Sequence, residues 1–164
     1  DVKKNLDFIG LRGLSFVCNA AYIYSRVRFE EGAPERDRPL AGQSPYLVNA
    51  GFFYQYDDKG ISASLLYNRI GKRIESVGVP MQNQDEDIPD IYEMPRNSLD
   101  LTFSKKIGKI VEIKAGIQDI LNSKVEYKQF VKLTDDKGGK SEREQLIRSY
   151  RPGVDINIGV SLRF

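Results

Sequence analysis

The chain has 164 residues, of which 40% are hydrophobic and 29% are charged, and its formal net charge is +2. This balance argues against a disordered chain, and the charges of both signs are mixed without a basic block, so we expect no nucleic-acid partner. The sequence has no histidine and one cysteine, Cys18, which excludes histidine-dependent triads, histidine-ligated zinc and an internal disulfide. The sequence contains no run of 18 apolar residues, so no transmembrane helix is predicted.

Seven segments alternate apolar and polar residues with a period of two, which predicts β-strands with one apolar and one polar face. In chain order the predicted strands are residues 2–9, 14–28, 45–56, 61–72, 98–104, 109–118 and 154–164. The last strand has the cleanest alternation. Its apolar face carries Val154, Ile156, Ile158, Val160, Leu162 and Phe164.

The connections between these segments alternate in length. Glycine-containing tight turns are expected at Gly10–Gly13, Asp57–Gly60 and Lys106–Gly108. Long polar links are expected at 30–44, 73–95 and about 122–150. Short turns at one end and long loops at the other are typical of an outer-membrane β-barrel, with the short turns on the periplasmic side.

Aromatic residues fall at both ends of the predicted strands if the last strand ends at the inner rim. The outer ends carry Tyr22, Tyr24, Tyr46 and Tyr67. The inner ends carry Phe8, Phe16, Phe52, Tyr54, Tyr56, Phe103 and Phe164. Two such belts are expected where amphipathic rings lie at a lipid–water boundary.

Three stretches carry a family resemblance. They are Ala115–Asn122 (AGIQDILN), Tyr150–Gly153 (YRPG) with the alternating strand that follows it, and Leu40–Asn49 (LAGQSPYLVN). In their order and spacing along the chain, these stretches resemble the TonB-dependent outer-membrane transporters of Gram-negative bacteria. The resemblance covers nearly the whole chain.

The resemblance implies an all-β fold, an antiparallel transmembrane β-barrel of about 22 strands filled by a plug. Seven strands are about a third of that number and are odd. We therefore expect residues 1–164 to be the C-terminal portion of the barrel domain, either as a fragment of one chain or as one of several chains that complete the barrel. The plug, roughly fifteen earlier strands and the N-terminal segment that contacts TonB are then expected outside this chain.

The implied function is active import of a scarce nutrient across the outer membrane, with energy from TonB. The substrate classes left open are a metal chelate, a vitamin, a glycan and a peptide. The implied partners are the rest of the barrel and its plug, TonB, outer-membrane lipids and, in some systems, a surface lipoprotein. We expect no cofactor and no enzymatic activity.

Candidate site residues lie at the last strand and in one loop. Val160, Leu162 and Phe164 match the terminal signal that the resemblance implies for barrel assembly. The carboxylates of Asp85, Asp87 and Asp90 are oxygen ligands of the kind that Ca²⁺ takes. Their spacing matches no EF-hand and acidic loop tips are usually solvated, so no metal site is expected.

Other charged residues have two possible roles each. The arginines near outer ends are suited to lipopolysaccharide phosphates or an anionic substrate, although solubilising loop charge is the expected role. They are Arg36, Arg38, Arg69, Arg73, Arg148 and Arg151. The lumen-facing residues are expected to pair across strands. They are Asp100, Glu112, Lys114 and Asp155.

Two other readings of the sequence remain open. The first is a barrel of another kind, either an outer-membrane enzyme such as a protease or lipase, or a porin-like channel. The absence of histidine argues against a catalytic centre in this part. The second is a soluble β-sandwich binding module, in which the apolar faces pack against each other instead of against lipid.

Overall fold

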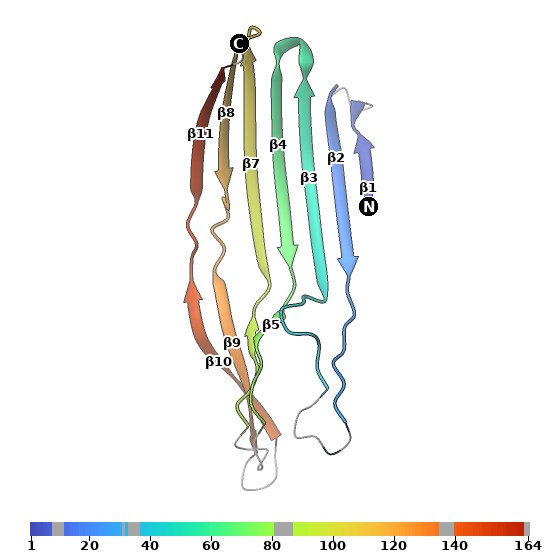
Figure 1. Cartoon of the computed structure of the whole chain (residues 1–164), viewed down its shortest axis with the longest axis vertical. Coiled ribbons are helices and arrows are strands. Elements are labelled where there is room, and N and C mark those ends of the chain that lie inside the picture. The colour runs from blue at the N-terminus through green and yellow to red at the C-terminus, as the bar shows by residue number, and fades with distance from the viewer. Residues whose placement is uncertain (8–11, 31, 33–36, 81–86, 135–139, 163–164) are drawn as a thin grey trace.

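A computed structural model describes residues 1–7, 12–30, 32, 37–80, 87–134 and 140–162. Two antiparallel sheets form the described chain, and a single-turn 3₁₀ helix, Asp57–Lys59, links two of the strands (Figure 1). Within these residues no helix has the length and apolar character needed to cross a membrane.

The larger sheet has seven strands in the order β1-β2-β3-β4-β7-β8-β11, and every neighbouring pair is antiparallel. The strands are β1 (Val2–Asn5), β2 (Leu14–Tyr22), β3 (Tyr46–Tyr56), β4 (Ile61–Ile70), β7 (Arg96–Ile107), β8 (Val111–Gln118) and β11 (Asp155–Leu162). All seven predicted strands are therefore confirmed as members of one sheet. Their bounds differ most at β2, which ends at Tyr22 and not at residue 28.

The segment after β2 remains close to the segment before β3 without forming a strand. Val27 and Arg38 form an isolated antiparallel bridge, and Arg26 pairs with Asp37 at 2.8 Å. The backbone N–H of Phe29 donates to Asp37 and lowers the pKa of its carboxyl group, and Arg26 acts in the same direction. Polar contacts of this kind hold a loop of charged residues where the apolar alternation has stopped.

The smaller sheet has four strands in the order β10-β9-β6-β5. They are β5 (Arg73–Ser76), β6 (Ile91–Glu93), β9 (Val125–Thr134) and β10 (Lys140–Tyr150). The prediction of long polar links at 73–95 and 122–150 was therefore wrong for much of both segments. Their strands lack a consistently apolar face, so the period-two pattern does not reveal them.

The smaller sheet continues four strands of the larger one. In the larger sheet β4, β7, β8 and β11 are neighbours, and β5, β6, β9 and β10 keep the same order beyond them. Figure 1 shows the smaller sheet lying end to end with the larger, at the end opposite the tight turns. The breaks fall at residues 71–72, 94–95, 119–124 and 151–154.

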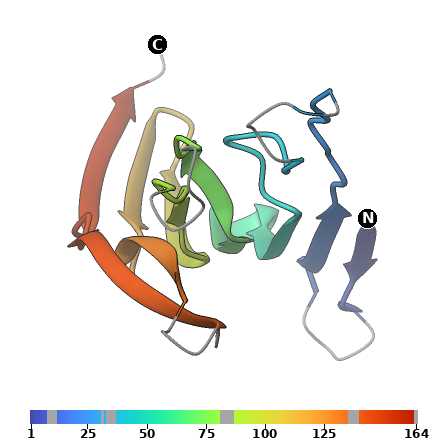
Figure 2. The same cartoon turned by 90° about the horizontal axis from the view of Figure 1, so that it is seen from below.

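The larger sheet is curved and open. Seen along the strands, it follows an arc (Figure 2). β1 and β11 are its two edge strands, and the described strands do not close a barrel. The structure thus supports an all-β antiparallel fold, and the complete 22-strand barrel stays a prediction.

Glycine is needed at the tight turns. Gly60 (φ 58°) follows the 3₁₀ helix and Gly108 (φ 61°) joins β7 to β8, both in the left-handed region. The N–H of Gly60 donates to the carbonyl of Asp57 at 2.9 Å, and its own carbonyl accepts from Lys106 at 2.8 Å. The predicted turn glycines are confirmed at both positions.

Gly60→Ala is expected to lower the free energy of unfolding by about 1–2 kcal/mol, because a Cβ disfavours the left-handed conformation. The added Cβ also meets the Lys106 Cβ at 2.9 Å. Gly108→Ala is the matched control, because its φ is similar but no atom lies within 4 Å of the new Cβ. It should therefore show the loss due to the backbone conformation alone. Denaturant titration measures both variants, and a neutral Gly60→Ala variant would contradict the turn geometry.

Candidate functional site

One face of the seven-stranded sheet is apolar across six neighbouring strands, from β2 to β11, whereas the edge strand β1 places Lys4 beside Phe16 on this face. The pairing register aligns the apolar residues predicted for each strand on the same side. One row across the sheet consists of Phe16, Phe52, Leu65, Leu101, Ile117 and Ile156. The next row toward the tight turns consists of Leu14, Tyr54, Ala63, Phe103, Ala115 and Ile158.

This apolar face is uncovered. Ile156 is 69% exposed and Ile158 is 77% exposed. In the described part of the chain, the buried apolar side chains are Ile74, Val125 and Tyr127, which belong to β5 and β9. A contiguous apolar surface of this extent marks a face that interacts with another protein surface, a ligand or lipid.

The height of the apolar face follows from the length of its strands. The 11 residues of β3 span about 34 Å along the strand, which becomes roughly 24 Å at a tilt of 45°. Tyr46 begins this strand opposite Tyr22, and Tyr54 and Tyr56 lie near its other end. The two ends of the face thus carry aromatic side chains, as predicted; Phe8 and Phe164 lie outside the described residues.

The opposite face is mostly polar and bonds to itself across the strands. The hydroxyls of Ser62 and Ser104 are 2.7 Å apart, and Ser64 and Thr102 follow at 2.6 Å. Phe53 and Leu66 are apolar exceptions at 39% and 38% exposure. Hydrogen bonds between neighbouring strands satisfy polar groups on this face without a second sheet.

The charges expected to pair across strands on the polar face have contacts of several kinds. Lys114 lies 3.6 Å from Glu112 on its own strand, because alternate residues of a strand share a face. Asp100 accepts a hydrogen bond from the backbone N–H of Asp119 at 2.8 Å. Asp155 lies opposite Gln118.

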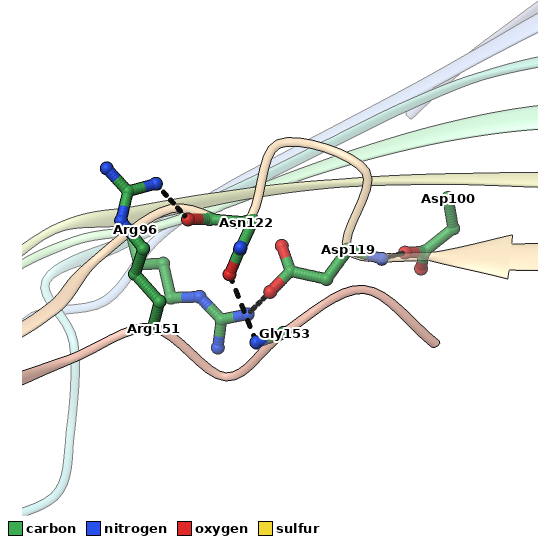
Figure 3. A network of polar contacts seen from close by, with 6 residues as sticks. All are labelled: Arg96, Asp100, Asp119, Asn122, Arg151 and Gly153. Carbon is green, nitrogen blue, oxygen red and sulfur yellow. Dashed lines mark hydrogen bonds and ion pairs between the residues drawn. The ribbon is translucent and has the colours of Figure 1, made fainter. Parts of the chain in front are cut away.

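A polar cluster lies where the two sheets meet, and we call it the junction cluster. It consists of Arg96, Asp100, Asp119, Asn122, Arg151 and Gly153 (Figure 3). Arg96 of β7 forms an ion pair with Asp119. The carbonyl of Asn122 accepts from Arg151 at 3.0 Å, and its side-chain oxygen accepts from the Gly153 N–H at 3.0 Å. The cluster therefore ties three breaks of adjacent strands together.

The backbone of the junction cluster is specialised. Asp119 (φ 52°) and Asn122 (φ 43°) are both left-handed, a conformation that Asp and Asn tolerate better than most residues. The N–H of Asn122 donates to the carbonyl of Asp119 at 2.8 Å and closes the turn. Arg96 Nε and Asp119 Oδ1 are buried without a hydrogen-bond partner, so the pair is enclosed by its neighbours.

The sequence did not identify this cluster as a site. It singled out Ala115–Asn122 and Tyr150–Gly153 separately, through the resemblance, and the structure places the ends of these two motifs in direct contact. An available signal was the pair of left-handed-tolerant residues, Asp119 and Asn122, three positions apart at the end of a strand.

The smaller sheet is held by charged and aromatic side chains. Lys72 Nζ lies 4.2 Å from the Tyr92 ring centroid and 4.3 Å from that of Phe130. Arg148 lies 4.1 Å from the ring centroid of Tyr127. Burial raises the pKa of the Tyr92 phenol, and the charge of Asp90 acts in the same direction. Cation–π contacts and partly desolvated rings therefore surround the small buried core that Ile74, Val125 and Tyr127 form in this sheet.

The predicted terminal signal is described in part. Val160 and Leu162 lie on the apolar face of β11 at 63% and 56% exposure, and Phe164 is outside the described residues. An exposed apolar edge strand is compatible with the predicted role, which stays a prediction.

The acidic loop residues are not gathered into a metal site within the described chain. No group of three or more metal-binding side chains occurs among the described residues. The Asp90 carboxylate accepts from the Gly78 N–H at 2.8 Å and from the Tyr92 hydroxyl at 3.4 Å. Asp87 is described, and Asp85 lies outside the described residues.

The predicted arginines do not form one cluster. Arg73 pairs with Glu93 at 2.6 Å, Arg38 lies 5.5 Å from the Phe29 ring centroid, and Arg151 joins the junction cluster. Arg69 donates to Asn97 at 2.8 Å. Arg36 lies outside the described residues.

Comparisons with protein-family models, with curated proteins and with solved structures found no match. What the chain does must therefore be inferred from the two faces of its larger sheet, from the junction cluster and from the resemblance in its motifs.

Proposed function

We propose that the seven-stranded sheet is part of the wall of an outer-membrane β-barrel. The complete protein would be a TonB-dependent transporter that imports a scarce nutrient, with TonB supplying the energy. The observation that carries the proposal is the uncovered apolar face, which crosses six neighbouring strands, from β2 to β11, and is opposed by a mostly polar face.

Lipid is the cover that best fits this face. Removing a large aliphatic side chain from water gains about 1.5–3 kcal/mol, so a row of exposed Ile, Leu and Phe strongly favours an apolar surrounding. A lipid bilayer supplies that surrounding over a band about 25 Å tall, close to the height derived for β3. The polar face would then line the interior of the barrel.

A soluble sandwich is supported less well. In a sandwich the second sheet packs face to face on the first at about 10 Å. Here the smaller sheet continues the strands end to end and leaves the apolar face of the larger one uncovered (Figure 1). The described chain thus offers no cover of its own for this face.

Transport is favoured over another barrel function by the motifs. The stretches 115–122 and 150–153 carry the resemblance, and their contact in the junction cluster gives both a joint structural role. The rest of the barrel, its plug and TonB are the proposed partners, with a surface lipoprotein as a further candidate. A metal chelate, a vitamin, a glycan and a peptide are the candidate substrates.

Lipid exposure is tested by fluorescence quenching in the complete protein. In a Cys18→Ala background, a bimane fluorophore is attached at Ile158→Cys or at Asn157→Cys, its neighbour on the polar face. In vesicles with brominated acyl chains, the label at 158 is expected to be quenched and the label at 157 to be unaffected. Equal quenching at both positions, or none at 158, would refute the lipid-facing assignment.

Transport is tested separately in cells with and without TonB. Uptake of labelled iron chelates, cobalamin, oligosaccharides and peptides is compared between cells with and without the complete protein. Uptake of one class that requires both the protein and TonB is the expected result. Uptake that requires the protein but not TonB would identify a passive channel instead.

A further inference from the structure

An arginine lies at the outer end of the apolar face. Arg69 of β4 shares its row with Val48 and Asn97 and follows Tyr67 on the same side of the sheet. Tyr46 begins the neighbouring strand two positions before Val48. A guanidinium thus stands where the apolar rows end and the tyrosines begin.

The hydrogen-bond partners of Arg69 are polar but uncharged. Its Nη1 donates to Asn97 Oδ1 at 2.8 Å, and the Tyr67 hydroxyl donates to the same oxygen at 2.9 Å. The guanidinium also interacts with the Tyr46 hydroxyl. These contacts hold the side chain in place and leave further N–H donors for another acceptor.

Gly71 contributes to this arrangement. A Cβ at this position would lie 2.7 Å from Cε1 of the Tyr46 ring and 2.8 Å from the Ser44 hydroxyl. The absence of a side chain at Gly71 therefore allows the Tyr46 ring to lie against the backbone, beside Arg69.

Arg69 is one of the described arginines that contact neutral groups, as Arg148 and Arg151 also do. Arg26, Arg73 and Arg96 each pair with a carboxylate. Among the described residues no carboxylate lies within ion-pair distance of Arg69, whose hydrogen-bonded partner is neutral. An uncompensated cation is costly on a lipid-facing surface, except at the interface, where the headgroup phosphates are anionic.

We propose that Arg69, with Tyr46, Tyr67 and Asn97 around it, binds the phosphate of a membrane lipid at the outer boundary of the apolar face. The planar guanidinium presents paired donors that match phosphate oxygens. The tyrosines lie at the depth where headgroups begin. This site rests on the proposed membrane location of the sheet.

The test uses the complete protein purified in detergent and native mass spectrometry. Phosphatidylglycerol is the phosphate lipid, and a diacyl glucosyl lipid with the same chains lacks the phosphate. Arg69→Gln is expected to weaken retention of phosphatidylglycerol roughly tenfold, as expected for loss of a charge-assisted hydrogen bond. Arg69→Lys should keep part of the retention, because the charge remains and the paired donors do not.

Lys114→Gln is the matched control, since it removes a cation from the polar face; it should retain phosphatidylglycerol as the unsubstituted protein does. Inorganic phosphate at millimolar concentration should not displace the lipid, and displacement would mean that the site recognises phosphate without the lipid. Heat-dependent gel mobility verifies that each variant is folded. Unchanged retention by Arg69→Gln, or equal retention of the glucosyl lipid, overturns the proposal.

The quenching experiment at residue 158 separates this outcome from failure of the proposed function. If position 158 is quenched and Arg69→Gln retains phosphatidylglycerol normally, the lipid-facing wall stands and the phosphate site falls. If position 158 is not quenched, both fall.

Discussion

Ile158→Arg is expected to lower the free energy of unfolding of the complete protein in lipid vesicles by about 2–4 kcal/mol. This is the cost of placing arginine on the lipid face near the middle of a barrel strand. Ile158 is well suited to the measurement because its side chain is 77% exposed. Loss of contacts within the chain therefore contributes little, and the lipid environment is the main quantity measured.

Asn157→Arg is the matched control on the same strand. Asn157 lies on the polar face opposite Gly116, so an arginine there is expected to change the stability by a fraction of the Ile158→Arg effect. Urea titration in vesicles, followed by heat-dependent gel mobility, gives both values. If the Ile158→Arg variant has an unchanged free energy of unfolding, or is more soluble than the parent protein, the apolar face is not in lipid.

Breaking the ion pair of the junction cluster is expected to cost about 2–3 kcal/mol in either single variant, Asp119→Asn or Arg96→Met. Removing one partner of a fully buried pair costs more, about 3–5 kcal/mol. The lower value is expected here because the side chains of Arg96 and Asp119 retain 28% and 13% of their exposure. Asn is chosen at 119 because it tolerates the left-handed backbone of that position.

The double variant Arg96→Met with Asp119→Asn isolates the interaction. Removing both charges leaves no unpaired ion, so the double variant should be more stable than the sum of the single losses predicts. A coupling energy of about 1 kcal/mol or more in a double-mutant cycle is the expected result. Strict additivity of the two losses would show that the ion pair does not hold the junction.

The strands of the larger sheet were predictable because one face of each is apolar. Val111, Ile113, Ala115 and Ile117 alternate with polar residues or glycine, and the period-two pattern has one structural explanation. The register followed in part from the turns, since Gly60 and Gly108 fix two hairpins.

The strands of the smaller sheet and the contacts of the junction were not predictable in the same way. β10 (KSEREQLIRSY) places charged and polar residues on both sides, so its pairing depends on partners elsewhere in the chain. The contact of Asn122 with Gly153 joins residues 31 positions apart. Spacing along one strand carries no information about such a contact, which arises from the order of strands across the sheet.

The end-to-end continuation of four strands has a consequence for protein engineering. Each of the four strands is interrupted by a break between the two sheets, and the order of neighbouring strands is the same on both sides of these breaks. Two residues added to each of β9 and β10 would leave the side chains of both strands on the faces that they now occupy. One added residue would move the side chains that follow it in that strand to the opposite face. Paired two-residue insertions in β9 and β10 are therefore a suitable way to extend the smaller sheet toward a foreign epitope or a sensing element.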